Sequence, residues 1–364
     1  MTRTDHLHDV PLDPAAWQLP VDVVATVVEH RGRPCLRFDE TFRPVVLPGV
    51  TIADGVLELD LAVEPVRSFH GLIWRVEDDE DFESFFVRPH QVGHPDAIQY
   101  TPVSHDISSW QLYHGPGFWA PIAFPVGDWF TIRVAFAGPR AEVFAADSAS
   151  PALVIPELKR RSVSGGIGLL VGGPDLHVAR FAWTDAVPVL PSDPSRPADS
   201  GSESVDADPG VIRGWAVSEP FAASQLGGQG EVPSLARIEV DRWMPAEAEP
   251  GGLLDLGRLH GVRDGRDTVL VRTTVTAVSP RLAALELGFS DRVVVFLDGR
   301  PVFAGDDSYR SRDYRFLGSI GFWDTVYLPL EAGEHELVLA VSEDFGGWGL
   351  QARFADEVSR DPSS

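Results

Sequence analysis

Apolar and polar residues alternate along most of this chain. Leu57, Leu59 and Leu61 are separated by Glu58 and Asp60, and residues 130–136 repeat the pattern. Because successive side chains of a strand point to opposite faces of a sheet, this period of two predicts strands buried on one face. Only residues 252–260 hint at a helical turn, and their glycines weaken it. We therefore predict an all-β protein.

Glycine and proline turns separate the predicted strands. Examples are Pro48-Gly49, Asp54-Gly55 and Gly138-Pro139. The clearest hairpin surrounds Asp298-Gly299, a pair that readily adopts the two positive φ angles of a type I′ turn. Short strands with frequent turns of this kind are typical of β-sandwiches.

The length and one biased segment predict two domains. Domains usually contain about 100–200 residues, so a chain of 364 residues exceeds one ordinary sandwich. Residues 187–210 are crowded with Pro, Ser, Asp and Gly and lack the large apolar residues of a core. We expect two β-sandwich (jelly-roll) domains, at residues 10–186 and 211–356, joined by a linker at 187–210.

Charge and cysteine content exclude several classes of function. The formal net charge is −24, so phosphate backbones and anionic lipid surfaces repel the chain, and we expect neither nucleic acid nor membrane as a partner. Cys35 is the single cysteine, which rules out an intrachain disulfide and a multi-cysteine metal site and favours a buried thiol. Residues 1–14 lack the apolar core of a secretory signal, so we expect a cytoplasmic protein.

A change of composition marks the candidate site. Five of the chain's 11 histidines lie between His70 and His114, beside arginine, glutamine, tyrosine and tryptophan. A solvated loop more often uses small polar residues, because large polar-aromatic side chains lose rotamer entropy when they are ordered. The segment is therefore interpreted as a binding surface.

Alternation along this segment predicts which side chains face outward. If Ile98 and Tyr100 point to the core, Gln99 faces out; if Trp110 and Leu112 point in, Gln111 and Tyr113 face out. Amides and a tyrosine on one face suit the hydroxyls and C–H faces of sugars. The predicted ligand-binding residues are Arg88, Gln91, Gln99, Tyr100, Trp110, Gln111 and Tyr113. The alternative is that they are ordinary strand and turn residues.

Three residues are candidates for acid/base catalysis: Glu83 and Asp96, with His90 as the alternative base. Strand parity opposes the first, since Glu83 shares a face with Phe85 and Val87. The structural alternative is that Glu83 pairs with an arginine at the sandwich edge and Asp96 caps a turn after Pro95. We expect no metal and no cofactor, because metal-ligand spacings, nucleophile elbows and nucleotide-binding loops are missing from the sequence.

Two tryptophans stand out in the second half. Trp323 and Trp348 lie in glycine-containing segments, at 306–324 and 344–349. Each is compatible with a sugar-stacking platform and equally with an aromatic plug packed on the core.

Four segments of the first domain carry a resemblance. They are GVLELDL, HGLIWRVEDDEDFESFFVRPH, GDWFTIRVAFAGPRAEVF and GGIGLLVGGPDLHVARFAW. Together they resemble concanavalin A-like lectin/glucanase sandwiches of the laminin-G-like type, including domains related to 3-keto-disaccharide hydrolases. The tryptophan-rich opening of the hydrolase pattern is missing. The resemblance implies a lectin-like sandwich and raises the expectation of a carbohydrate ligand.

The second domain resembles the galactose-binding-like jelly rolls appended to many glycosidases and esterases. The resembling segments are VVVFLDGRPVFAG, TVYLPLEAGEHELVLAV and GGWG. In such proteins the domain is usually accessory, so the resemblance implies carbohydrate without naming a substrate.

Three functions remain open at this point. The leading hypothesis is a protein that binds a glycan or glycoside on the outer face of the N-terminal sandwich. The second is a glycoside hydrolase or lyase that acts on glycosides, including oxidised ones. The third is a protein–protein interaction module that uses exposed tryptophans. The sequence does not determine the sugar or the oligomeric state.

Overall fold

The structure is a computed structural model. It describes residues 7–21, 23–145, 148, 150–160, 164–190, 192, 210–228, 230–313, 317–355 and 359–360. Within these ranges the chain forms strands and short 3-10 turns and no α-helix, which confirms the predicted all-β class. The described residues contain no helix of the length and apolar character needed to cross a membrane.

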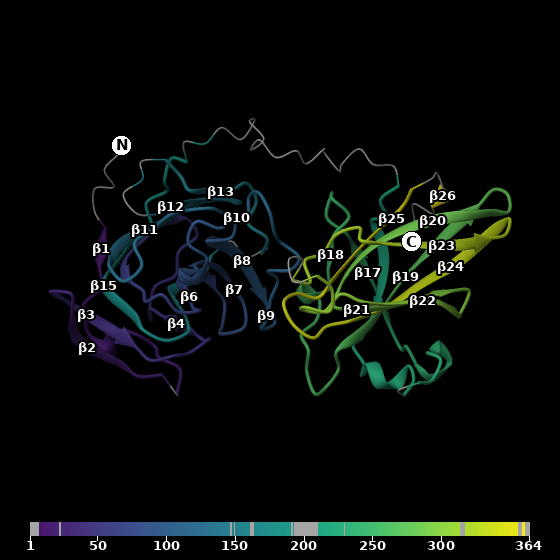
Figure 1. The fold of residues 1–364 in the computed structure, drawn as a ribbon, viewed down its shortest axis with the longest axis horizontal. Helices are drawn as coiled ribbons and strands as arrows, with labels where there is room; N and C mark the ends of the chain where they lie inside the picture. The colour runs from purple at the N-terminus through teal and green to yellow at the C-terminus, as the bar shows by residue number, and fades with distance from the viewer. Residues whose placement is uncertain are drawn as a thin grey trace. The chain divides into compact units, whose positions relative to one another are not determined.

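The chain divides into two compact units, each a sandwich of two antiparallel sheets (Figure 1). Unit 1 comprises Met1–Asp106 and Tyr113–Ser200, and unit 2 comprises Ile107–Leu112 and Gly201–Ser364. The two predicted sandwiches are therefore present. The predicted linker lies mostly outside the described residues and stays a prediction.

Unit 1 consists of sheets A and B. The strand order of sheet A is β13 (Leu153–Ile155), β12 (Arg140–Ala145), β11 (Trp129–Ala137), β5 (Gly55–Ala62), β15 (Leu176–Thr184), β3 (Arg33–Phe38) and β2 (Ala25–His30), with β1 (His8–Asp9) beside β15. The order of sheet B is β10 (Trp119–Ala120), β8 (Ile98–Ser104), β7 (Phe82–Val87), β6 (Phe69–Val76), β14 (Gly166–Gly172) and β4 (Pro44–Val46). Two 3-10 turns, η1 (Pro14–Ala16) and η2 (Pro89–Gln91), also belong to this unit.

Unit 2 consists of sheets C and D. The strand order of sheet C is β17 (Trp243–Glu247), β16 (Gly214–Ser218), β19 (Thr268–Ala277), β24 (Gly333–Ser342), β21 (Arg292–Leu297) and β22 (Arg300–Asp306), with β26 (Ser359–Arg360) beside β19. The order of sheet D is β18 (Leu254–Asp255), β25 (Gly349–Phe354), β20 (Arg281–Ser290) and β23 (Asp324–Leu330). The remaining elements are β9 (Ile107–Ser108), η4 (Ala223–Gln225), η5 (Leu235–Arg237) and η6 (Leu256–Arg258).

The predicted alternation builds the core of unit 1. Leu57, Leu59 and Leu61 of β5 are fully buried and belong to one apolar cluster with Trp74 of β6 and Phe85 of β7. Burying a leucine or phenylalanine side chain contributes about 1.5–3 kcal/mol, so the apolar side chains that alternate along the strands stabilise the packing of the two sheets. Cys35 is also buried, as expected for a structural thiol.

The predicted hairpin is present in unit 2. Asp298 and Gly299 have φ angles of 49° and 76° and connect β21 to β22. The Asp298 carboxylate accepts hydrogen bonds from the backbone N–H of Glu336 at 3.0 Å and lies 2.7 Å from Nδ1 of His335. The turn therefore has both the backbone angles of type I′ and a side-chain anchor on β24.

A glycine loop of unit 2 packs around the segment Ile107–Leu112. A Cβ on Gly346 would lie 2.5 Å from Oε1 of Gln111, and one on Gly347 would lie 2.9 Å from Cγ of Leu112. The indole of Trp348, the residue after Gly347, is fully buried and donates to the Val341 carbonyl at 3.0 Å, so Trp348 packs in the core. Glycine is therefore required here by close approach as well as by positive φ.

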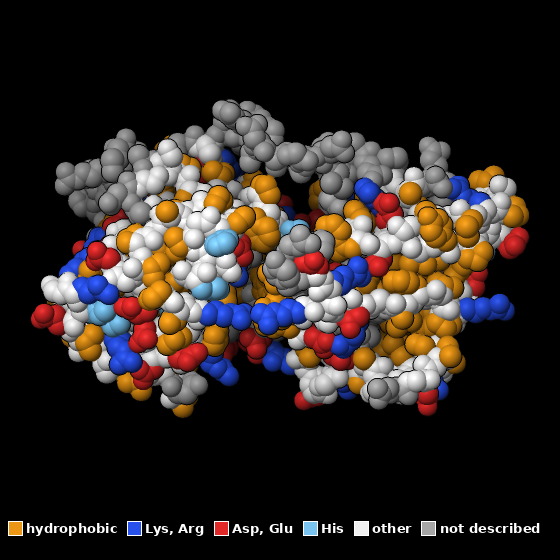
Figure 2. Space-filling view, in the orientation of Figure 1, with side chains coloured by type: hydrophobic (Ala, Val, Ile, Leu, Met, Phe, Trp, Pro, Cys, Tyr) orange, Lys and Arg blue, Asp and Glu red, His pale blue; other side chains and the backbone are white. Residues whose placement is uncertain are grey.

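Acidic and basic side chains are scattered over the visible faces of both units, whereas apolar side chains gather in a broad area on unit 2 (Figure 2). The net charge of −24 is therefore not gathered into a single patch on these faces.

We expect Gly346→Ala to lower the free energy of unfolding by about 2–4 kcal/mol. The substitution adds a Cβ against Gln111 to a residue whose φ of 102° already strains an alanine. Guanidinium unfolding followed by circular dichroism measures the loss. Gly299→Ala is the matched control, because its φ is also positive but the space around it is open; its cost should be about 1 kcal/mol. Equal losses in the two variants would show that the contact with Gln111 is unimportant.

Candidate functional site

The register of sheet B places several predicted residues side by side. Phe86 of β7 pairs with Gln99 of β8, and Ser84 pairs with Thr101. Ile98 and Tyr100 point into the sandwich core, so Gln99 and Thr101 lie on the opposite, outer face of the sheet. The alternation therefore assigned the face of Gln99 correctly.

The expectation that Gln99, Gln111 and Tyr113 are exposed is wrong. Their exposed fractions are 3%, 0% and 2%. Sheet B carries apolar side chains on its outer face as well, where Ile73, Phe82 and Val103 form a second buried cluster. Alternation determines the face of a side chain but not whether that face is covered.

Trp110 and Gln111 lie outside sheet B altogether. They follow β9 in a turn whose first hydrogen bond joins the Trp110 N–H to the Ser108 carbonyl at 3.0 Å. The Gln111 amide belongs to unit 2, where it donates to the Leu317 carbonyl at 2.9 Å and accepts from the Ser290 hydroxyl at 3.0 Å. The predicted strand through Trp110 and Tyr113 is therefore replaced by an irregular segment that is divided between the two units.

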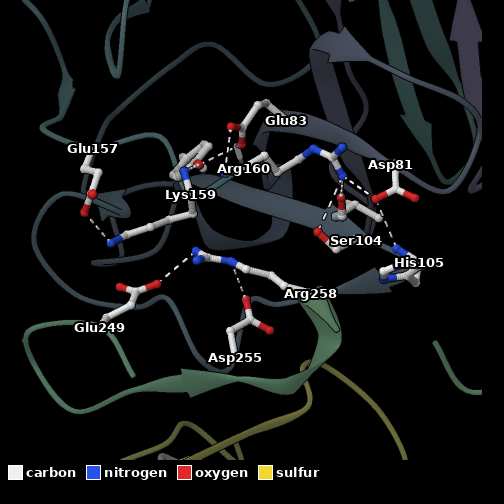
Figure 3. A network of polar contacts seen from close by, with 12 residues as sticks. Asp81, Glu83, Ser104, His105, Glu157, Lys159, Arg160, Glu249, Asp255 and Arg258 are labelled. Atoms are coloured by element: carbon white, nitrogen blue, oxygen red, sulfur yellow. Dashed lines mark hydrogen bonds and ion pairs between the residues drawn. The ribbon is translucent and has the colours of Figure 1, made fainter. Parts of the chain in front are cut away.

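Glu83 lies in the core of unit 1 and has a structural role (Figure 3). Its carboxylate accepts hydrogen bonds from the Tyr100 hydroxyl at 2.7 Å and from the backbone N–H of Arg160 at 3.1 Å. The Arg160 guanidinium binds Asp81 at 2.5 Å and Glu77 at 2.8 Å. Burial raises the pKa of Glu83 above its ordinary value. The Glu83 carboxyl is fully buried. It pairs with an arginine as expected, but through the backbone N–H of Arg160 and not through the guanidinium.

The structure brings Arg88, His90, Gln91 and Asp96 together at one end of sheet B. Arg88 and Asp96 form an ion pair and are 13% and 18% exposed. Gln91 follows His90 in η2, and its backbone N–H donates to the Arg88 carbonyl at 2.8 Å. Asp96 therefore balances the charge of Arg88, in place of its expected role as a turn cap.

Phe69 of β6 lies at the centre of this group. Its ring centroid is 5.6 Å from that of Phe86 and 5.5 Å from that of His90, at steep angles. The guanidinium carbons of Arg67 and Arg88 each lie 5.7 Å from the same centroid. We call Arg67, Phe69, Phe86, Arg88 and His90 the Phe69 cluster. Phe69, Arg88 and His90 are half-buried and Arg67 is exposed.

Among the described residues, the buried polar atoms on or beside this face that have no hydrogen-bond partner include Nε2 of Gln99, Oγ1 of Thr101 and Nδ1 of His90. A buried polar group that stays unpaired costs about 1–3 kcal/mol. Desolvation lowers the pKa of His90 to about 4, assisted by the charges of Arg88 and Arg67 and opposed by Asp96. The imidazole is therefore neutral at physiological pH and offers one donor and one acceptor.

A groove of about 760 Å³ lies beside β4 in unit 1. Its floor includes Pro44, Val46 and Val76, and its rim carries Glu77 and Asp79. Among the described residues that line it there is no predicted site residue and no aromatic ring. The groove therefore lacks the flat apolar surface on which a sugar ring stacks.

Unit 2 contains buried carboxyls that the sequence reading missed. Asp291, Asp307 and Glu343 are 0%, 2% and 6% exposed. Burial raises the pKa of Asp291 and of Asp307 to about 6, and it raises that of Glu343 well above its ordinary value. Among the described residues no group of three or more acidic, histidine or cysteine side chains is arranged to hold a metal ion. Asp291 directly precedes β21 and Glu343 directly follows β24, and these two strands are neighbours in sheet C.

We expect Glu83→Ala to lower the free energy of unfolding by about 2–4 kcal/mol, because Tyr100 and the Arg160 N–H would lose a buried acceptor. Urea unfolding provides the measurement. Asp79→Ala is the control, since the ion pair of Asp79 with Arg43 spans 3.7 Å between exposed side chains and is worth about 0–1 kcal/mol. A loss no larger in Glu83→Ala than in the control would contradict a structural role for Glu83.

The buried acids predict a dependence of stability on pH. The pKa of Asp307 is about 6 in the folded protein against 3.8 for the ordinary side chain, so the folded state binds the proton more tightly. The stability that Asp307 contributes is fully present below about pH 4 and is lost as the pH rises to about 6. Across this interval, the free energy of unfolding of Asp307→Asn should therefore rise relative to that of wild type by up to about 3 kcal/mol.

Unfolding midpoints at pH 4 to 8 test the prediction for Asp307. Asp306→Asn is the matched control: desolvation raises the pKa of Asp306, but hydrogen bonds from Ser308 and Ser311 and the charge of Arg292 together lower it below its ordinary value. Its stability relative to wild type should fall or stay level as the pH rises. Parallel curves for wild type and Asp307→Asn would contradict the prediction.

Comparisons with known proteins assign neither a family nor a function to this chain. Neither the protein families nor the curated proteins that were searched contain a match. Among solved structures, a CBM66 carbohydrate-binding module of Bacillus subtilis is 12% identical, with 46% of this chain and 90% of that chain covered and a TM-score of 0.30. A galectin, LEC-6 of Caenorhabditis elegans, is 14% identical, with 48% and 99% covered and a TM-score of 0.28. A family 35 carbohydrate-binding module from an environmental isolate is 14% identical, with 43% and 93% covered and a TM-score of 0.23. Scores this low do not assign a function, and the laminin-G-like and galactose-binding-like assignments stay predictions.

Proposed function

We propose that this protein binds a carbohydrate at the Phe69 cluster of unit 1. The observation that carries the proposal is the neutral His90, whose Nδ1 atom has no partner among the described residues and whose ring lies against Phe69. A sugar offers hydroxyl groups that can pair with the imidazole and an apolar C–H face that can pack on the Phe69 ring.

Each member of the cluster matches part of a pyranose. The half-buried Phe69 ring supplies apolar surface for the C–H groups. The neutral His90 imidazole both donates to and accepts from hydroxyls. The exposed Arg67 guanidinium adds several donors in a fixed fork, as does the partly exposed Arg88.

The Gln99 amide extends the surface toward β8. It pairs in register with Phe86, whose ring contacts Phe69. Because its Nε2 atom is buried and unpartnered among the described residues, a hydroxyl acceptor that reaches it would remove an existing cost. Because Gln99 is only 3% exposed, a ligand reaches its amide only if the side chains that cover it move.

Binding is favoured over hydrolysis by the state of the carboxyls. Glycoside hydrolysis usually requires two carboxyl groups on either side of the scissile bond. Glu83 is fully buried between Tyr100 and the backbone of Arg160, and Asp96 is paired with Arg88. Neither carboxyl is presented to a ligand at the Phe69 cluster.

An array of neutral and uronic-acid oligosaccharides, followed by calorimetry of the binding sugars, tests the proposal. Phe69→Ala and His90→Ala should each weaken the affinity about 10-fold, through loss of ring contact and of the hydroxyl partner. Phe42→Ala is the matched control, since Phe42 is a 65% exposed phenylalanine of the same unit. The affinity of Phe42→Ala should stay near that of wild type, and so should the melting temperatures of all three variants. Equal affinities in Phe69→Ala and Phe42→Ala would refute the site, and absence of any binding sugar would refute the function.

A further inference from the structure

Three aromatic rings of unit 2 meet at one point. The ring centroids of Trp110, Tyr309 and Phe345 lie 5.7–6.1 Å apart in all three pairs. Phe345 is 53% exposed, and the other two side chains are half-buried. We call these residues the three-ring corner. It lies in a different unit from the Phe69 cluster, and its interpretation is independent of the proposed carbohydrate site.

Backbone hydrogen bonds fix the segments that carry the rings. The N–H of Gln111, next to Trp110, donates to the Gly346 carbonyl at 2.9 Å, beside Phe345. The Phe345 N–H donates in turn to the buried Asp291 carboxylate at 2.7 Å. The N–H of Ser308, which precedes Tyr309, donates to Asp306 at 3.0 Å. The corner is therefore organised before any ligand arrives, which lowers the entropic cost of binding.

The angles between the rings disfavour a sugar. The interplanar angles are 83°, 63° and 70°, so no two rings form a common flat platform for a pyranose. Rings at steep angles instead present several π faces and edges to one compact group. A cation within about 6 Å of several ring centroids gains from each of them.

Charges on the same loops favour a cation. The guanidinium carbon of Arg310 already lies 4.8 Å from the Tyr309 centroid, so this surface holds a positive group within its own chain. The described acidic residues of the loops are Asp291, Asp306, Asp307, Asp313, Glu343 and Asp344. Besides Arg310, two arginines oppose them: Arg292 pairs with Asp344, and Arg312 pairs with Asp307 at 3.0 Å. Acidic side chains outnumber basic ones here, as they do in the whole chain.

We propose that Trp110, Tyr309 and Phe345 bind a methylated ammonium group of a small cationic ligand. A trimethylated (quaternary) ammonium group is large, weakly hydrated and without hydrogen-bond donors, which suits a surface made mainly of aromatic π faces. A phosphate attached to the same ligand is disfavoured, because the surrounding carboxylates repel it.

Choline is the probe, and 3,3-dimethylbutan-1-ol is its uncharged counterpart of the same shape. Calorimetry or ligand-observed NMR on the full chain should show choline binding at least about 10-fold tighter than the alcohol. Phosphocholine should bind more weakly than choline. Equal binding of choline and the alcohol would overturn the assignment of a cation site, and tighter binding of phosphocholine would overturn the role of the carboxylates.

Matched variants locate the site. Phe345→Ala and Tyr309→Ala should each weaken choline binding about 10-fold. Tyr327→Ala should leave it unchanged, since Tyr327 is a 63% exposed aromatic residue on β23 outside the corner. Arg310→Ala should tighten binding, because the competing guanidinium leaves the Tyr309 ring. Equal affinities in Phe345→Ala, Tyr309→Ala and Tyr327→Ala, with melting temperatures near wild type, would refute the proposal.

Discussion

A polar atom that is removed from water must find a partner inside the protein, and this requirement organises both units. Where it is met, the polar group holds loops to sheets. The Glu83 carboxylate accepts hydrogen bonds from the Tyr100 hydroxyl and the Arg160 backbone N–H. The Gln111 amide accepts a hydrogen bond from the Ser290 hydroxyl and donates one to the Leu317 carbonyl. Where it is not met within the described residues, as at Nδ1 of His90 and Nε2 of Gln99, the unpaired atom is one of the observations behind the proposed carbohydrate site.

Local pattern was sufficient to predict the architecture. Alternation at Leu57, Leu59 and Leu61 depends only on neighbouring residues, and so does the pair of positive φ angles at Asp298 and Gly299. The candidate surface was predicted less well, because exposure depends on what covers a face. Gln99 was assigned to the right face of sheet B, yet it is 3% exposed.

The positions of Trp110 and Gln111 were beyond local reasoning. The partners of Gln111 are 179 and 206 residues away in the sequence, and no periodicity near residue 111 contains that information. The glycines at 346 and 347 were visible as a conspicuous pair, but their reason, close approach by the segment Ile107–Leu112, appears only in three dimensions. The same holds for the three-ring corner, which joins residues from three distant parts of the chain.

Because unit 2 contains Ile107–Leu112 as well as its C-terminal stretch, its sequence is discontinuous. During synthesis on a ribosome, these few residues emerge long before the first strand of the unit to which they belong. Their amide and indole groups must stay solvated, or be held by other partners, until sheets C and D have formed. A gene fragment that starts at the second sandwich lacks the piece that fills its glycine loop, so the apparent domain boundary is a poor place to cut.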